Sequence, residues 1–142
     1  MFPVATDLNA LPSPKSGLIL LVDDFADARE MYAEYLAFRG YRVVTAASGA
    51  CALKAASEER PAIILMDLEM RQMSGREAMR SLKADPRFAG VPIVAFTAHA
   101  LEAERSQALY DGFDAVIPKP CLPDELVTLI QPFLASDRAA SA

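Results

Sequence analysis

Residues with acidic, hydroxyl and amine side chains follow the most apolar segments of this chain. Asp23 and Asp24 come directly after the run LILLV, and Asp67 comes directly after AIILM. Thr97 follows PIVAF, and Lys119 lies just beyond FDAVI. Carboxylate oxygens are ligands that hard divalent cations such as Mg²⁺ prefer, and coordination removes the repulsion between neighbouring carboxylates. A carboxylate can also attack phosphorus and form an acyl phosphate, so this set of residues suits metal-assisted phosphoryl transfer to Asp67.

Each of these residues has an ordinary structural explanation when it is taken alone. Asp24 could cap a helix, and Asp67 could be a turn residue. Thr97 is a β-branched residue at the end of an apolar run, and Lys119 could be a solvated surface lysine. The functional interpretation therefore depends on whether the secondary structure brings all of them to one place.

The spacing of apolar residues alternates between that of strands and that of helices. Continuous apolar runs are typical of strands buried on both faces of a parallel sheet, and spacings of three and four residues are typical of amphipathic helices. The expected strands are 18–22, 41–46, 62–66, 92–96 and 113–117, and the expected helices are 25–38, a helix from Ser48 to near Pro61, one after Ser74, one at 101–110, and one from Pro123 onward.

Five alternating strands and helices predict an α/β fold, a doubly wound parallel sheet covered by helices on both faces. In such sheets ligands bind beyond the carboxyl ends of the strands, which is where the residues described above stand. We expect one folded domain at 17–134, preceded by a flexible leader at 1–16 and followed by a flexible tail at 135–142.

Composition excludes several classes of partner. The chain has 142 residues, of which 53% are hydrophobic and 23% charged, and its formal net charge is -5. Without a basic patch, binding to nucleic acid or to a membrane surface is disfavoured. The opening segment does not have the pattern of a secretory signal, and Cys51 and Cys121 lack metal-site spacing, so we expect a cytoplasmic protein with reduced thiols.

Five short motifs in this chain resemble those of response-regulator receiver domains of two-component signalling. They are LVDD, ILMDLEM, MSG, VAFTAHA and IPKP, and they occur in the order and spacing of that family over roughly residues 17–134. The resemblance implies a flavodoxin-like sheet of five parallel strands in the order 2-1-3-4-5, with five helices. It also implies a phosphorelay switch rather than an enzyme that turns over an external substrate.

The same resemblance implies roles for the acidic residues. Asp67 would be the phosphoacceptor, and its donor would be a histidine kinase or a histidine phosphotransfer protein. Asp23, Asp24 or both would bind Mg²⁺ together with Asp67, and the backbone carbonyl of Glu69 would complete the protein ligands.

The remaining motifs imply how the phosphoryl group would be held and read. Thr97 would hydrogen-bond one phosphoryl oxygen, and Lys119 would pair with another, next to a cis peptide bond at Pro120. The output would be a population shift read by an unknown downstream protein. The chain is too short for a second, effector domain after the last helix, so we expect a single-domain receiver. Receivers of this kind occur as monomers or as phosphorylation-induced dimers, which leaves a homodimer open.

Four positions deserve comparison with the family pattern. Val116 stands three residues before the lysine, where an aromatic residue that moves with the threonine is usual. Arg71 stands where proline is frequent, and Ser74 where aspartate is frequent. His99, two residues after Thr97, occupies a variable position that tunes access of water to the phosphoryl group. Phosphorylation is therefore expected, with a readout that differs from the usual one.

Three other functions remain open at this level. A phosphorylation-independent adaptor with the same fold is favoured by Val116. A Mg²⁺-dependent phosphatase could use the same aspartate. A flavin-binding protein of similar topology is disfavoured, because the loops after the first and third strands offer acids rather than a phosphate-binding cluster of glycines or hydroxyls.

Overall fold

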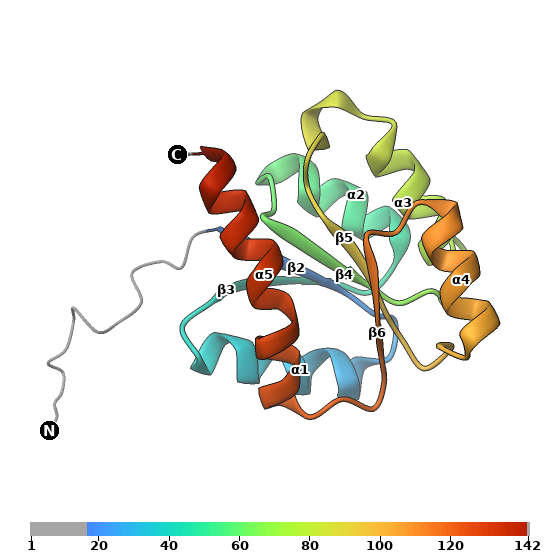
Figure 1. The fold of residues 1–142 in the computed structure, drawn as a ribbon, viewed down its shortest axis with the longest axis horizontal. Coiled ribbons are helices and arrows are strands. Elements are labelled where there is room, and N and C mark those ends of the chain that lie inside the picture. Colours follow the sequence, from blue (N-terminus) through green and yellow to red (C-terminus); the bar gives the residue numbers. More distant parts are fainter. Residues whose placement is uncertain (1–16, 142) are drawn as a thin grey trace, which may run out of the picture.

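A five-stranded parallel sheet lies at the centre of the molecule (Figure 1). The computed structural model describes residues 17–141. Along the sheet the strands lie in the order β3-β2-β4-β5-β6, which is the order 2-1-3-4-5 when they are counted along the chain. This confirms the predicted topology. The strands are β2 (Leu18–Val22), β3 (Arg42–Ala46), β4 (Ile63–Met66), β5 (Ile93–Thr97) and β6 (Ala115–Pro118).

Five helices cover the two faces of the sheet. The core on one face includes residues of α1 and α5, and the core on the other includes residues of α2, α3 and α4 (Figure 1). The helices are α1 (Ala26–Phe38), α2 (Gly49–Glu58), α3 (Gly75–Lys83), α4 (Glu102–Asp111) and α5 (Pro123–Ser141), and a short 3-10 helix, η1, spans Pro86–Phe88.

Strand β2 is buried on both faces of the sheet, which accounts for its unbroken apolar sequence. Side chains alternate between the faces of a strand, and here Ile19 and Leu21 join the core under α1 and α5. Leu20 and Val22 join the core under α2, α3 and α4. All five residues of β2 are buried, as expected for a central strand of a doubly wound sheet.

Local signals set several of the helix ends. The Ser48 side chain accepts a hydrogen bond from the N–H of Cys51 and caps α2. Ser74 and Glu77 form the predicted capping box at the start of α3. Serine in place of the frequent aspartate at position 74 therefore still begins the helix. Gly112 ends α4 with a φ of +127°, a region that favours glycine.

The two ends of the chain compare differently with the sequence-based expectation. The leader expected at 1–16 lies outside the described residues. A frayed tail was expected from residue 135, but α5 continues as a helix through Ser141. The segment ASDRAAS is rich in alanine and contains neither Gly nor Pro, so nothing in it ends the helix.

Two smaller expectations concern the cysteines and membranes. Cys51 is exposed and Cys121 is buried, and both are free thiols, as predicted. Within residues 17–141, every helix is too short or too polar to cross a membrane.

Candidate functional site

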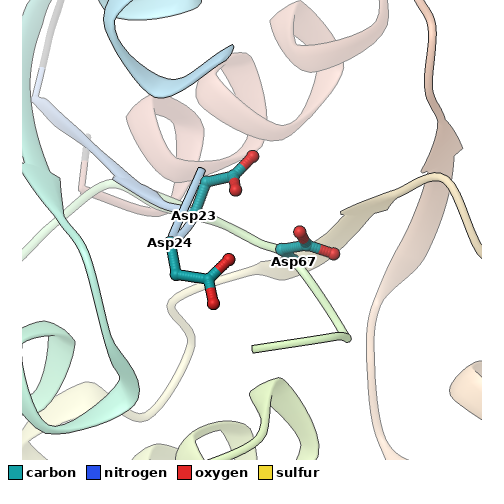
Figure 2. Close-up of side chains that lie close together, drawn as sticks. All are labelled: Asp23, Asp24 and Asp67. Carbon is teal, nitrogen blue, oxygen red and sulfur yellow. The ribbon is translucent and has the colours of Figure 1, made fainter. Parts of the chain in front are cut away.

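The register of the sheet brings the predicted acidic residues together. Val22 of β2 pairs with Met66 of β4, so Asp23 and Asp67 leave the sheet at the same level. The N–H of Asp67 donates to the carbonyl of Val22 at 3.0 Å, which extends the pairing by one residue. Figure 2 shows Asp23, Asp24 and Asp67 at this carboxyl edge, and β5 places Thr97 at the end of the neighbouring strand.

The three carboxylates form one cluster. Each of Asp23, Asp24 and Asp67 offers an oxygen, and these oxygens all lie within 4.8 Å of one another (Figure 2). The side chain of Asp23 is only 3% exposed and that of Asp67 13%, whereas that of Asp24 is 26% exposed. The cluster is therefore sheltered on the side of the sheet and open on the side of Asp24.

Backbone N–H groups hold two of these carboxylates in place. An oxygen of Asp23 accepts from the N–H of Phe25 at 2.9 Å, across the entry to α1. An oxygen of Asp67 accepts from the N–H of Glu69 at 3.2 Å, in the loop after β4. Both are local turns that Asp favours, so the turn expected at Asp67 is compatible with a role of this residue in the cluster. The helix cap considered for Asp24 is not observed, since α1 has no side-chain cap.

Lys119 lies opposite the acidic cluster. Its ammonium group hydrogen-bonds a carboxylate oxygen of Asp23 and lies 3.7 Å from an oxygen of Asp67. The lysine side chain is 15% exposed, and its ammonium group also lies 5.2 Å from the centre of the Phe96 ring. The peptide bond between Lys119 and Pro120 is cis, as predicted. The meeting of positions 23, 24 and 67 opposite position 119, on which the sequence interpretation depended, is thus present.

Thr97 is the last residue of β5 and lies at the same carboxyl edge of the sheet. It is fully buried at the end of β5, and its hydroxyl accepts from the N–H of His99 at 3.0 Å. The carbonyl of Thr97 accepts from the N–H of Lys119 at 2.9 Å, which ties the two residues together through the backbone. The His99 side chain is half-exposed, with one ring nitrogen 3.7 Å from Glu104.

The surroundings of Asp67 disfavour its charge in part. Burial raises the pKa of the Asp67 carboxyl above its ordinary value, and the Asp23 carboxylate acts in the same direction. The charge of Lys119, the N–H of Glu69 and the hydroxyl of Thr97 lower that pKa, but burial outweighs them. A cation or a covalent bond at the Asp67 oxygens would relieve this cost.

Arg71, which stands where proline is frequent in the family, makes a backbone contact in the loop after β4. The backbone N–H of Arg71 donates to a carboxylate oxygen of Asp24 at 3.2 Å, and the guanidinium nitrogen lies 3.9 Å from the same oxygen. The frequent proline has no N–H and could not make this bond. Gln72 follows with a φ of +60°, which is uncommon for a residue other than glycine.

Val116 is buried in the core and does not line the acidic cluster. It is 8% exposed and belongs to the apolar core that includes Ala108 of α4. In the sheet it pairs with Ala95 of β5. The usual aromatic side chain is therefore replaced by a small residue packed beneath α4.

Two residues near the site were not assigned a role from the sequence. Gly75, in the quoted motif MSG, begins α3 directly against the backbone of Asp67, where a side chain would not fit. Tyr32 lies within the helix expected at 25–38, and its hydroxyl reaches the loop after β6. The motif was the available signal for Gly75, whereas no local pattern indicates a contact between Tyr32 and a segment 89 residues away.

The donor set fits a hard divalent cation. The three carboxylates of the cluster face one largely sheltered ammonium group, and the further cation near Asp24, Arg71, has a side chain that is 91% exposed. Oxygen ligands in small number are what Mg²⁺ accepts, since it keeps several waters for a phosphoryl ligand. Asp23, Asp24 and Asp67 are the residues that would hold it.

The family model of the response regulator receiver domain matches residues 19–131 of this chain. The chain belongs to that family. Receiver domains are signalling switches of two-component systems, so the resemblance seen in the motifs is confirmed. The match also agrees with the observed sheet order and with the acidic cluster at its carboxyl edge.

Two curated relatives cover this receiver domain to different extents. The chain is 34% identical to the response regulator Rre1 of a Synechocystis strain, over 87% of this chain and 54% of Rre1. It is 30% identical to the polar-differentiation response regulator DivK of Brucella anthropi, over 85% of this chain and 97% of DivK. The chain thus spans about half the length of Rre1 and nearly the full length of DivK.

Solved receivers share the fold. The chemotaxis protein CheY4 of Vibrio cholerae superposes with a TM-score of 0.77 at 28% identity, over 82% of this chain and 97% of that chain. The receiver domain of a signal transduction histidine kinase from Syntrophus aciditrophicus gives 0.76 at 28% identity, over 85% and 92% of the two chains. The doubly wound fold expected from the sequence is therefore that of known receivers.

Proposed function

We propose that this receiver is a phosphoacceptor switch, in which Asp67 takes a phosphoryl group from a histidine kinase or a histidine phosphotransfer protein. One observation carries the proposal. An oxygen of Asp67 lies within 4.8 Å of oxygens of Asp23 and Asp24. The ammonium nitrogen of Lys119 lies 3.7 Å from an oxygen of Asp67. This arrangement supports both metal binding and the neutralisation of a phosphoryl group.

The reaction is a displacement at phosphorus. A carboxylate oxygen of Asp67 attacks the phosphorus of a phosphohistidine, the new O–P bond forms, and the P–N bond breaks with its electron pair passing to the imidazole nitrogen. Mg²⁺, when bound, neutralises charge on the transferring phosphoryl oxygens. Asp23, Asp24 or both, with the backbone carbonyl of Glu69, would hold that ion together with Asp67.

Lys119 and Thr97 hold the transferred group. The ammonium group of Lys119 pairs with one phosphoryl oxygen, and the hydroxyl of Thr97 donates to another. Both side chains are sheltered, which strengthens such interactions because water does not compete with them. His99, at the edge of the site, controls the access of the water that hydrolyses the acyl phosphate.

The output is contact with a downstream protein, driven by a population shift when Asp67 is phosphorylated. The carbonyl of Thr97 is bonded to the N–H of Lys119, so both phosphoryl-binding side chains are connected to β6. Since Val116 replaces the usual aromatic residue, the readout passes through the movement of Thr97 and its loop without an aromatic partner.

The proposal is tested with a small phosphodonor and Mg²⁺, read on a phosphate-affinity gel. The wild-type chain is expected to show a shifted band that disappears in Asp67→Asn and when the metal is chelated. Asp27→Asn, which changes an exposed carboxylate in the first turn of α1, is the matched control and should keep the shift. A shift that survives in Asp67→Asn would place the phosphoryl group elsewhere.

An adaptor that binds its partner without phosphorylation is the second candidate, and Val116 is the observation that favours it. An adaptor of this kind predicts the opposite result on the phosphate-affinity gel. With Mg²⁺ present, neither the wild-type chain nor Asp67→Asn would shift, and partner binding would be equal for both.

A further inference from the structure

We propose that Tyr32 of α1 is a positioning residue that holds Lys119 against the phosphoacceptor. Its hydroxyl fixes the backbone of the loop that follows β6, and Lys119 lies at the start of that loop. The inference rests on the proposed function of Lys119 and extends it to a residue outside the acidic cluster.

Tyr32 makes two hydrogen bonds to one residue of the loop. Its hydroxyl donates to the carbonyl of Cys121 at 2.7 Å and accepts from the N–H of Cys121 at 3.4 Å. Tyr32 is 5% exposed, and Cys121 is buried as well. Buried hydrogen bonds to backbone groups fix a loop more firmly than exposed ones, because water cannot replace them without a cost.

The composition of the loop makes Cys121 the natural attachment point. On its strand side, Lys119 is held by the bond from its own N–H to the carbonyl of Thr97. On the other side comes Pro120, which has no N–H to donate. Cys121 is therefore the first residue after Lys119 whose backbone can both donate and accept, and Tyr32 uses both groups.

A second contact runs from Tyr32 toward the ammonium group. The Tyr32 ring packs edge-to-face on Phe96, with ring centres 4.9 Å apart and an interplanar angle of 74°. The ammonium group of Lys119 lies 5.2 Å from the centre of that same Phe96 ring. Tyr32 thus supports the backbone of Lys119 through Cys121 and the side chain of Lys119 through Phe96.

Positioning matters here because lysine has a long and flexible side chain. Its ammonium group contributes to phosphoryl transfer only when it faces the Asp67 oxygens, and a small misplacement of a catalytic group can slow a reaction by up to two orders of magnitude. Removing the tyrosine hydroxyl should loosen the loop while leaving Phe96 packed, so we expect phosphorylation to slow about fivefold.

Tyr35 provides a matched control on the same helix. Its hydroxyl hydrogen-bonds the side chain of Asp124 at the start of α5, one helical turn along α1 from Tyr32. That contact is between side chains and does not touch the backbone of the loop. Tyr35→Phe removes the same atom as Tyr32→Phe and should leave the phosphorylation rate unchanged.

The experiment measures the rate of phosphorylation by a small phosphodonor with saturating Mg²⁺. Tyr32→Phe and Tyr35→Phe are each made with Lys119 present and in the Lys119→Ala background. We expect Tyr32→Phe to slow the reaction about fivefold when Lys119 is present and to have no further effect when it is absent. Equal slowing in both backgrounds would mean a general structural role and would overturn the inference.

Hydrogen exchange supplies a readout that does not depend on activity. The amide of Cys121 should exchange faster in Tyr32→Phe than in the wild-type chain or Tyr35→Phe, with an unchanged circular dichroism spectrum. Unchanged exchange at Cys121 would overturn the inference, as would an unchanged phosphorylation rate. A wild-type chain that accepts no phosphoryl group would overturn the proposed function and this inference together, whereas failure confined to Tyr32→Phe would overturn the inference alone.

Discussion

The first residue of α3, Gly75, lies directly against the backbone of Asp67. A Cβ atom on Gly75 would be 2.1 Å from the carbonyl oxygen of Asp67 and 3.0 Å from the Cα of Leu68. Backbone atoms cannot move aside as the end of a flexible side chain can. The packing of α3 therefore sets the position of the loop that carries the acidic side chain.

Gly75→Ala should consequently destabilise the protein and disturb the site. We expect a loss of about 2–3 kcal/mol in the free energy of unfolding, the upper part of the range for overpacking, and a slower phosphorylation of Asp67. Urea denaturation and the phosphodonor assay measure the two effects. Gly49→Ala, at the matching first position of α2, is the control because the atoms nearest to its Cβ, at 2.8–3.0 Å, belong to the side chain of Met73, which can move more easily than backbone. Equal losses in both variants would contradict this explanation.

Arg71→Ala should bind Mg²⁺ more tightly. The guanidinium group lies 3.9 Å from the Asp24 oxygen that also accepts the N–H of residue 71, so it competes with a cation for that carboxylate. Because this side chain is 91% exposed, the effect is screened, and we expect about a twofold gain in affinity. Isothermal titration calorimetry measures it, with Lys54→Ala, an exposed cation of α2, as the control. Weaker binding by Arg71→Ala would refute the prediction.

Lys119→Ala should destabilise the metal-free protein. It removes the ammonium group that faces the sheltered carboxylates of Asp23 and Asp67, and a buried charge left without its partner costs about 3 kcal/mol. Urea denaturation in the presence of a chelator measures the loss. Added Mg²⁺ should stabilise this variant more than the wild-type chain, since a cation then meets less repulsion.

The exposed ion pair between Lys83 and Asp114 supplies the comparison for that variant. Its nitrogen and oxygen are 2.8 Å apart, but both side chains are more than one third exposed. Lys83→Ala should therefore cost less than about 1 kcal/mol and should respond to Mg²⁺ as the wild-type chain does. Similar losses for the two lysines would show that burial does not set the cost at Lys119.

Acid stability should depend on Asp111 at the end of α4. The amide of Gln107 and the guanidinium group of Arg76 each hydrogen-bond its carboxylate at 2.8 Å. These contacts lower the pKa of Asp111 below its ordinary value. Its contribution to stability is therefore present above the unfolded-state pKa of about 4 and is lost as pH falls through the lower, folded-state pKa.

The measurement compares Asp111→Asn with the wild-type chain by thermal or urea unfolding between about pH 3 and pH 7, a range that crosses the unfolded-state pKa of about 4. The variant should be less stable by about 1 kcal/mol at neutral pH, and the difference should shrink below about pH 4. Asp27→Asn, in the exposed first turn of α1, is the control. A difference that is constant over the whole range would contradict the role assigned to the Asp111 charge.

Much of the fold and of the site could be predicted because the relevant signals are local. The apolar run before Asp23 and the one before Asp67 require burial on both faces, and that alone makes them central parallel strands whose ends share an edge. The capping box of Ser74 and Glu77 begins α3 by contacts within one helical turn. The helical continuation to Ser141 escaped prediction because a polar, alanine-rich segment has the composition of either a tail or a helix.

The amino-acid sequence by itself determined which side chains meet at the carboxyl edge, since strand ends and side-chain alternation follow from spacing along the chain. Only the tertiary structure decided the contacts between distant segments: the ammonium group of Lys119 on Asp23, 96 residues away, the Tyr32 hydroxyl on Cys121, and the close approach of Gly75 to Asp67. Such contacts depend on how helices and loops pack across the sheet, where distances of a few tenths of an ångström count, and no periodicity in the sequence records them.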